Sequence, residues 1–464
     1  MFQFLSCTSL FLFVSAALFA QQPAPSPAAA PSLDYSFFKE RVQPVFLKKR
    51  AGHARCVTCH THRVPPLEEL HAGAANWDEE QSRRNFDAWK LFVVPGDPMK
   101  SRVLLHPLAK AAGGDHFHAG GKHWKSRSDP EWRTLAGWVR GETSSRSGKV
   151  RVLQTNAAGD DIHVIDPATN TVVGLIQDIE VPHGITIAPD GSRIYITNES
   201  LTTLDVVDAK TLRVSKRIPL SGRPNNVDVG NDGKYVYVGI AEAPGAVDVI
   251  DTVSMKNVKS IPVKGRVHNV YVTPDGKYAI SGSIPEKTIS VIDVSTHTLS
   301  WTLTLSAGIR PMTFTTNPDG STKNIIVQLS DFHGFAVVDF AAREETRRVT
   351  FPDPAGQHKV TEILQGSPAH GLAITPDGKM LWSTSKYYNC VFAYSLPDYK
   401  MLKVVDVGPH PDWLAITPDG KSLYVAVAGA DTTVVVDIES MKVVERIPVG
   451  NVPKRVTAGL LDIE

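Results

Sequence analysis

The chain has 464 residues, 42% of them hydrophobic and 21% charged, which is enough apolar material for a large folded core and excludes a disordered protein. Its formal net charge of +1 argues against a nucleic-acid-binding protein, and four cysteines are too few for a disulfide-rich scaffold. Length alone suggests about three domains, but the repeats described below reduce the expected number to two.

The N-terminal residues are expected to direct export and not to belong to a folded domain. Residues 1–20 carry no charged side chain and include an apolar run of the length found in secretory signal peptides. Residues 21–33 are rich in proline and alanine, which is typical of an extended tether. We therefore expect a periplasmic or otherwise exported protein, without a transmembrane anchor once the signal peptide is removed.

The next segment contains a C-x-x-C-H motif, formed by Cys56, Cys59 and His60. Two thiols one helical turn apart can form thioethers with the two vinyl groups of one haem, and the adjacent histidine can then bind the iron. A redox dithiol and half of a zinc site are the alternatives. The motif lacks the βαβ context of the first and the further Cys or His ligands of the second. It therefore predicts covalently bound haem c with His60 as the proximal iron ligand.

Residues 34–146 are predicted to form a small all-α domain around this motif. Asp129 and Pro130 are typical of a helix start, and that helix is expected to end at Gly141. A second helix is expected to begin at Asp97-Pro98. Five of the eight tryptophans lie in this segment, where a flat apolar cofactor needs aromatic walls: Trp77, Trp89, Trp124, Trp132 and Trp138.

The two halves of the chain differ in the sign of their net charge. Residues 31–148 contain 19 lysines and arginines and 13 aspartates and glutamates, which gives a net charge of +6. Since the whole chain has a net charge of +1, the other residues together carry −5. Opposite charges favour docking of the two halves, or docking of the small half to an acidic partner. Unrelated variation of the surface would give the same totals.

Three motifs follow one another along the small domain: Cys56–His60, Val94–Pro98 and His118–Gly121. Together they resemble the small planctomycete-type c cytochrome domain, over about residues 35–142. The resemblance implies a single covalent haem, His60 as its proximal ligand and an all-helical, cytochrome c-like fold.

The sixth iron ligand has four candidates in the sequence, because the Met-Pro pair that many relatives place before the last helix is missing here. His118 is favoured, since its H-x-G-G context matches a His-containing variant of the family and the glycines let the backbone approach the haem. His123, His116 and Met99 are the alternatives. Two histidine ligands would give a lower reduction potential than a His/Met pair.

From about residue 147 to residue 464 the chain is repetitive. Seven strands end in an apolar residue or tyrosine followed by Asp or Ser, at residues 165–166, 207–208, 250–251, 292–293, 338–339, 394–395 and 436–437. Most of these spacings lie near the period of a four-stranded propeller blade, so we predict an all-β, seven-bladed propeller. The repeats, including Ile194–Asn198, resemble the YVTN family of seven-bladed propellers, a fold that hosts binding modules and redox enzymes alike.

Turns of the type Pro-Asp-Gly or Asn-Asp-Gly recur with the same period, at residues 189–191, 231–233, 274–276, 318–320, 376–378 and 418–420. There is one turn fewer than there are blades. We therefore expect one inner strand to come from the far end of the chain, with residues 452–461 pairing beside residues 150–154 and closing the ring.

The residue seven positions before the Asp of each turn is expected to line one rim of the central channel. These residues are His183, Asn225, His268, Met312, His370 and Asp412, with Lys454 in the closing strand. Three histidines with Asp412 could converge on a second metal ion such as copper or zinc. A water-filled structural channel is the alternative.

The repeat half has two further notable features, an insertion and a single cysteine. An insertion near residues 351–366 precedes His370 and is expected on the same rim, where it could cover the channel, hold the small domain or be a tolerated surface loop. Cys390 is expected to be a buried, small apolar residue of a strand.

The preferred hypothesis is an exported electron-transfer protein in which a monohaem c-type cytochrome is fused to a propeller that serves as a docking or substrate platform. Its partner would be a redox protein or a small electron donor or acceptor, and not a nucleic acid. One alternative is an oxidoreductase whose channel site passes electrons to the haem. Another is a non-catalytic scaffold.

Overall fold

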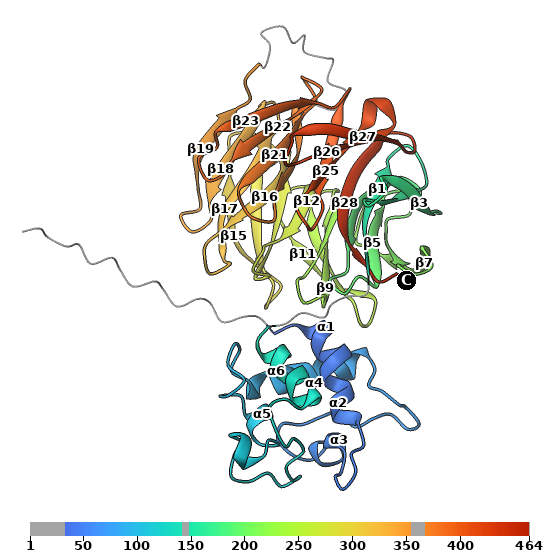
Figure 1. Cartoon of the computed structure of the whole chain (residues 1–464). Helices are drawn as coiled ribbons and strands as arrows, with labels where there is room; N and C mark the ends of the chain where they lie inside the picture. The colour runs from blue at the N-terminus through green and yellow to red at the C-terminus, as the bar shows by residue number, and fades with distance from the viewer. Residues whose placement is uncertain (1–32, 142–147, 354–366, 464) are drawn as a thin grey trace, which may run out of the picture.

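The structure is a computed structural model that describes residues 33–141, 148–353 and 367–463. A helical segment and a β-propeller follow one another along the chain (Figure 1). The expected signal peptide, nearly all of the tether and most of the expected insertion lie outside the described residues.

The propeller consists of seven sheets, each of four antiparallel strands, as the repeats predict. In the first blade the C-terminal strand β28 (Pro453–Leu461) pairs with β1 (Lys149–Asn156), followed by β2 (Ile162–Asp166) and β3 (Thr171–Ile176). The next three blades are β4 (Pro182–Ile187), β5 (Arg193–Asn198), β6 (Thr203–Asp208) and β7 (Arg213–Pro219); β8 (Pro224–Val229), β9 (Tyr235–Ile240), β10 (Ala246–Asp251) and β11 (Lys256–Pro262); and β12 (Val267–Val272), β13 (Tyr278–Ser283), β14 (Thr288–Asp293) and β15 (Thr298–Thr304). The last three are β16 (Ile309–Thr316), β17 (Thr322–Leu329), β18 (Gly334–Asp339) and β19 (Glu344–Thr350); β20 (Ala369–Ile374), β21 (Met380–Ser385), β22 (Cys390–Ser395) and β23 (Met401–Asp406); and β24 (Pro411–Ile416), β25 (Ser422–Val427), β26 (Thr432–Asp437) and β27 (Lys442–Pro448), with the short helix η4 (Ala428–Ala430) before β26.

Burial follows the position of a strand within its blade. The second and third strands, such as β5 and β6, are almost entirely buried, whereas the outermost strand β7 is mostly exposed. The sheets therefore pack face to face through apolar side chains around the ring. Cys390 in β22 is 2% exposed, which confirms the expectation of a buried residue.

The turns that join the first two strands of a blade need a left-handed residue, which explains their recurring glycine. Gly191 has a φ of +74° and Gly233 has a φ of +68°, a region that other residues rarely adopt.

The ring closes through its two ends. β28 pairs antiparallel with β1, with Lys149 opposite Leu461 and Leu153 opposite Thr457. This pairing confirms the predicted closure. It gives the first blade its fourth strand, so each of the seven sheets among the described residues has four strands.

The helical segment contains several short helices and two longer ones. They are α1 (Tyr35–Phe37), η1 (Phe38–Val42), α2 (Gln43–Leu47), α3 (Cys56–His60), α4 (Glu79–Trp89), η2 (Lys90–Phe92), α5 (Arg102–Leu105), η3 (Lys110–Ala112) and α6 (Pro130–Val139). Their shared core includes Phe38, Leu104, Leu135 and Trp138, each completely buried.

The helix predicted to start at Asp129 is confirmed, whereas the helix predicted to start at Asp97 begins later. The Asp129 carboxylate accepts a hydrogen bond from the Glu131 backbone at the beginning of α6, as expected. The helix expected from Asp97 begins only at Arg102. The Asp97 side chain accepts a hydrogen bond from the Met99 backbone, and the Ser101 hydroxyl donates to the Asp97 carbonyl. These local bonds hold residues 97–101 in a turn.

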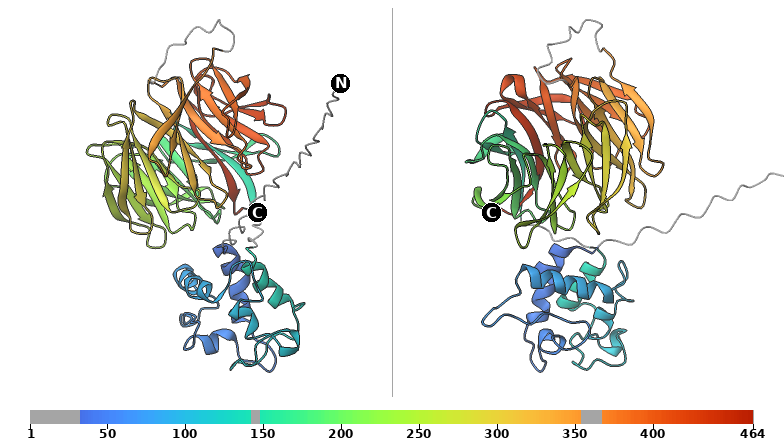
Figure 2. Two further views of the ribbon diagram at one scale, coloured as in Figure 1. Left: turned by 90° about the vertical axis from the view of Figure 1, so that its left-hand side faces the viewer. Right: turned by 180° about the vertical axis from the view of Figure 1, so that it is seen from behind.

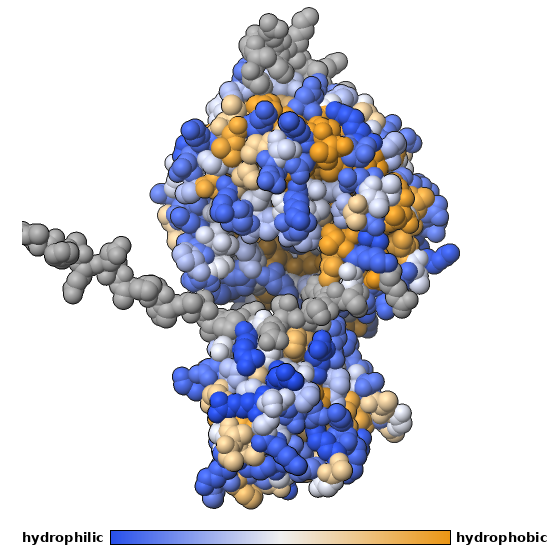
Figure 3. All heavy atoms as spheres, viewed as in Figure 1, coloured by the Kyte–Doolittle hydropathy of each residue, from blue (hydrophilic) through white to orange (hydrophobic). Residues whose placement is uncertain are grey.

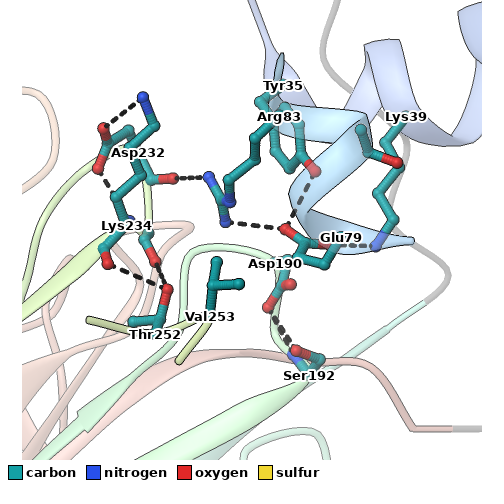
Figure 4. A network of polar contacts seen from close by, with 12 residues as sticks. Tyr35, Lys39, Glu79, Arg83, Asp190, Ser192, Asp232, Lys234, Thr252 and Val253 are labelled. Carbon is teal, nitrogen blue, oxygen red and sulfur yellow. Dashed lines mark hydrogen bonds and ion pairs between the residues drawn. The ribbon is translucent and has the colours of Figure 1, made fainter. Parts of the chain in front are cut away.

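The two parts meet through polar contacts. Arg83 of α4 donates a 2.8 Å hydrogen bond to the Asp232 carbonyl, and Lys234 lies 3.3 Å from Asp87. Figure 4 shows Arg83 between this carbonyl and the carboxylate of Glu79, which lies 3.0 Å away in the same helix. The junction therefore depends on a few hydrogen bonds and ion pairs.

The junction places the helical segment on one face of the propeller. Asp232 and Lys234 belong to the turn that follows the inner strand β8, so they lie where the inner strands end. The residues that begin the inner strands lie at the opposite face. In Figures 1 and 2 the helical segment lies below one face of the ring, and Figure 1 shows α3 at the end of the segment away from the propeller.

None of the helices in the described residues has the length and apolar character needed to cross a membrane.

We predict that removing residues 453–464 lowers the melting temperature by at least about 10 °C, because the first blade loses its inner strand and a melting point shifts by about 2–4 °C per kcal/mol at this size. Thermal unfolding followed by circular dichroism measures this. Deletion of residues 463–464, which leaves β28 intact, is the control. An unchanged melt after the longer deletion would contradict the closure as a source of stability.

Candidate functional site

A cavity of about 380 Å³ opens in the helical segment and brings the C-x-x-C-H motif together with distant residues. This volume lies within the range of small-molecule and cofactor sites. Its lining includes Phe46, Arg55, Cys56, Cys59, His60, Arg63, Val64, Trp89, Phe92, Arg102, Val103, His106, Phe117, His118, His123, Trp124 and Leu135. The surface of the segment seen in Figure 3 is mainly hydrophilic, so this apolar lining is a local feature.

The helix α3 presents both cysteines and His60 to the cavity. Cys56 and Cys59 are free thiols, and each is partly buried. The Nδ1 atom of His60 lies 2.8 Å from the Pro65 carbonyl, which can only accept, so Nδ1 carries the proton. The Nε2 atom makes no hydrogen bond to any described residue and keeps its lone pair.

His118 comes from the loop before α6 and has the same arrangement. Its Nδ1 atom lies 2.7 Å from the Gly121 carbonyl, so its Nε2 atom also keeps a lone pair. Gly121 has a φ of +80°, and a Cβ on Gly120 would lie 3.0 Å from the His118 ring. The two glycines therefore shape the loop that holds this ring.

The two imidazoles face the same cavity. The ring centroids of His60 and His118 are 6.4 Å apart, and their planes differ by 20°. Burial lowers the pKa of both histidines, which favours the neutral imidazole that binds metals. A carbonyl that orients the other ring nitrogen is the usual support of a metal-binding histidine.

Two of the other candidates for a sixth ligand lie outside the cavity, and the third lacks the hydrogen bond that orients His118. His116 is exposed and does not line the cavity. Met99 lines a separate pocket beside Arg127. His123 does line the cavity, and burial lowers its pKa to about 4. Its ring packs against His53 with centroids 4.6 Å apart, and its buried Nδ1 atom has no hydrogen-bond partner among the described residues that would orient the ring.

His106 also lines the cavity, although its sequence context did not mark it. Its ring lies 6.3 Å from that of His118. Its Nδ1 atom is paired with Asp115, and its Nε2 atom lies 3.0 Å from Arg102. Both ring nitrogens of His106 are therefore engaged.

The aromatic walls differ in part from the expectation. Trp89 and Trp124 line the cavity, whereas Trp77, Trp132 and Trp138 belong to the core around it. Phe46, Phe92 and Phe117 take the remaining places. A tryptophan count could not separate cavity from core, because both need large apolar side chains.

The second candidate site is the rim where the inner strands begin. The pairing of each inner strand with its neighbour shows which residues of the seven inner strands are equivalent. One set of equivalent residues is Ile185, Val227, Val270, Met312, Leu372, Leu414 and Val456. Two positions earlier, at the rim, the equivalent residues are His183, Asn225, His268, Arg310, His370, Asp412 and Lys454. The rim position assigned to Met312 is therefore wrong. Met312 is 3% exposed in an apolar cluster, and Arg310 holds its place on the rim.

Side chains at this rim form a buried polar network. His370 lies 2.6 Å from Asp412, whose second oxygen lies 3.2 Å from Lys386. Burial alone would raise the pKa of Asp412, but Lys386 and His370 hold it well below its usual value. The rings of His268 and His370 have centroids 6.0 Å apart, and His183 lies 3.7 Å from Glu199.

The described residues contain no group of three or more His, Cys, Asp or Glu side chains arranged to hold a metal ion. The four residues of the predicted channel site therefore do not converge on one point. His370 contacts Asp412 and His268, whereas His183 lies next to Glu199. A metal in the channel stays a prediction.

No protein-family model matches the chain, and no curated protein matches it. Among solved structures, hydrazine synthase of Kuenenia stuttgartiensis is similar with a TM-score of 0.54 and 22% identity, covering 61% of this chain and 91% of that chain. The periplasmic gluconolactonase PpgL of Pseudomonas aeruginosa is similar with a TM-score of 0.54 and 18% identity, covering 67% and 99%. At these identities the likeness establishes the propeller fold alone. The resemblances to the c cytochrome domain and to the YVTN family stay predictions from sequence motifs.

We predict that Asp412→Asn destabilises the protein by about 3 kcal/mol at pH 7, because breaking a buried ion pair leaves Lys386 without this carboxylate. Since the pKa of Asp412 is depressed in the folded state, its stabilising effect is complete above the unfolded value of about 3.9 and is lost as the pH falls below it. Urea unfolding at pH 7 and at pH 3 measures the effect.

The exposed Asp398→Asn variant is the control for this experiment. Equal stability of Asp412→Asn and the unsubstituted chain at pH 7 would contradict the buried ion pair.

Proposed function

We propose that the protein is an exported monohaem c-type cytochrome fused to a propeller, and that it acts in electron transfer. The observation that carries the proposal is the shared cavity of Cys56, Cys59, His60 and His118, in which both imidazoles have an oriented Nδ1 and an unbonded Nε2. This donor set fits a haem, because it combines two thiols for covalent attachment with two neutral nitrogen ligands.

Each residue has a distinct role in this proposal. Cys56 and Cys59 would hold the haem by thioether bonds, and His60 and His118 would supply nitrogen ligands for its iron. The ring centroids of these two histidines are 6.4 Å apart and both rings line the same cavity, so one bound group could contact both. A bound haem would supply reversible one-electron chemistry.

The walls of the cavity would tune that chemistry. Trp89, Phe46 and Leu135 line it with apolar surface, which excludes water and lowers the local polarity. The carbonyls of Pro65 and Gly121 orient the two imidazoles and increase their basicity. With two histidine ligands we expect a lower potential than with a His/Met pair.

The mouth of the cavity supports docking of an acidic redox protein. Val64 and Phe117 border the cavity and are 74% and 70% exposed, although they are apolar. Arg55, Arg63 and Arg102 line the same cavity and are exposed. An apolar centre with surrounding positive charge is suited to an acidic partner, whose approach it would accelerate.

The propeller would then act as a platform and not as the direct source of electrons. Its channel rim lies where the inner strands begin, and the helical segment is docked where they end. Six-residue strands span about 20 Å, and α3 lies beyond the far side of the junction (Figure 1). Electron tunnelling falls exponentially with distance, which disfavours direct transfer from channel to haem. Both structural neighbours are named as enzymes, so catalysis by the propeller itself is the alternative role.

We predict that a Cys56→Ala, Cys59→Ala double variant, produced in a host that attaches c-type haem, carries no covalent haem. Denaturing gel electrophoresis with haem staining and intact mass determination measure attachment. Cys390→Ala is the matched control and should retain one haem per chain. Covalent haem in the double variant, or none in the unsubstituted protein, would refute the proposal.

We predict that His118→Ala converts a six-coordinate low-spin haem into a high-spin or ligand-exchanging one and that His118→Met raises the reduction potential. Visible absorption spectroscopy and redox titration measure these changes. His123→Ala, which alters a cavity histidine outside the proposed pair, should leave the low-spin spectrum unchanged. A low-spin spectrum in His118→Ala together with its loss in His123→Ala would assign the ligand to His123.

A further inference from the structure

The channel rim opposite the helical segment carries more buried positive than negative charge. Arg455 is 3% exposed and Lys386 is 5% exposed, and the rim positions Arg310 and Lys454 are largely buried. Asp412 is the fully buried carboxylate that faces them, with Glu199 near Lys454 and Arg455 and Asp331 near Arg310. Cationic side chains in a low-dielectric site need compensating negative charge.

The two carboxylates nearest to Lys454 and Arg455 are already paired with other residues. Asp412 is engaged by Lys386 at 3.2 Å and by His370 at 2.6 Å. Glu199, the second carboxylate nearby, pairs with Arg223 at 3.3 Å. Neither Arg455 nor Lys454 has a carboxylate within ion-pair distance among the described residues.

The Arg455 guanidinium is fixed in place and incompletely satisfied. It lies 3.7 Å above the ring of Trp413, and one of its amino groups donates to Asn269 at 2.8 Å. Its Nε atom is buried and has no hydrogen-bond partner among the described residues. A rigid guanidinium with an unused donor is suited to an oxygen anion.

The histidines of the rim add hydrogen-bonding groups but little charge. Burial lowers the pKa of His183 and His268 well below the usual value, with Lys454 and Arg455 adding to the effect. Burial also lowers the pKa of His370 to about 4, against the opposing effect of Asp412. At neutral pH the excess positive charge therefore comes from lysine and arginine.

We propose that this channel mouth binds a small oxyanion, an organic carboxylate or inorganic phosphate, through Arg455 and Lys454. These two neighbouring cations repel a metal cation, and the nearest carboxylates, Asp412 and Glu199, are paired with other residues. The inference is independent of the haem, because it concerns the opposite end of the molecule.

Isothermal titration calorimetry on the full chain at constant ionic strength tests the proposal, with citrate, acetate and inorganic phosphate as probes. We expect saturable binding of at least one probe at one per chain. Lys454→Gln should weaken it about tenfold, because a charge-assisted contact is lost. Arg455→Lys should also weaken binding, because the planar guanidinium is lost, and it serves as the second variant if Lys454→Gln fails to fold.

Lys379→Gln is the matched control, because Lys379 is exposed and follows an inner-strand turn at the opposite face. It should bind the probe as the unsubstituted chain does. A preference for citrate or acetate identifies an organic carboxylate as the ligand class, and a preference for phosphate identifies an inorganic oxyanion. Three results would overturn the proposal. They are the absence of saturable binding, binding by both rim variants as tight as that of the unsubstituted chain, and one-to-one binding of zinc or copper that His183→Ala abolishes.

Discussion

The pairing of β28 with β1 is the constraint on which the rest of the propeller depends. Six blades use consecutive strands, but the first needs a strand from the end of the chain. A propeller that lacks this strand would leave a buried apolar surface and unpaired backbone groups next to two neighbouring blades. The closure therefore couples residues about 300 positions apart, as the hydrogen bond between the Gln154 side chain and the Arg455 carbonyl illustrates.

The same strand also determines the electrostatics of the channel. Lys454 is the second residue of β28 and occupies the position that His183 and Asn225 hold in other inner strands, and Arg455 follows it directly. Most inner strands contribute a neutral or paired residue there, whereas the closing strand contributes two cations. Ring closure and the positive character of the channel mouth thus have one structural origin.

The repeat pattern predicts the propeller well because each blade is a local unit with its own turns. The pattern gives the wrong rim residue in β16, because two additional residues lie there between the rim position and the turn. Counting back seven residues from Asp319 therefore reaches Met312 instead of Arg310. Strand pairing, which sequence spacing does not contain, is what identifies the correct residue. In the helical segment, the motif predicts Cys56, Cys59 and His60, but the proximity of His118 depends on how the loop before α6 folds over α3. Similarly, Asp97 followed by Pro98 is typical of a helix start, but the Asp97 side chain accepts a hydrogen bond that stabilises a turn.

The arrangement separates the two candidate sites along the molecule. The cavity of the helical segment includes α3, which lies at the end away from the propeller (Figure 1), and all of the residues that line it belong to the helical segment. The channel mouth lies on the opposite propeller face. The junction between them consists of exposed or half-exposed polar contacts such as that of Lys234 with Asp87, which contribute little stability individually. Such a junction can hold the two parts near each other without coupling their chemistry, so each site can be occupied by its own ligand or partner at the same time.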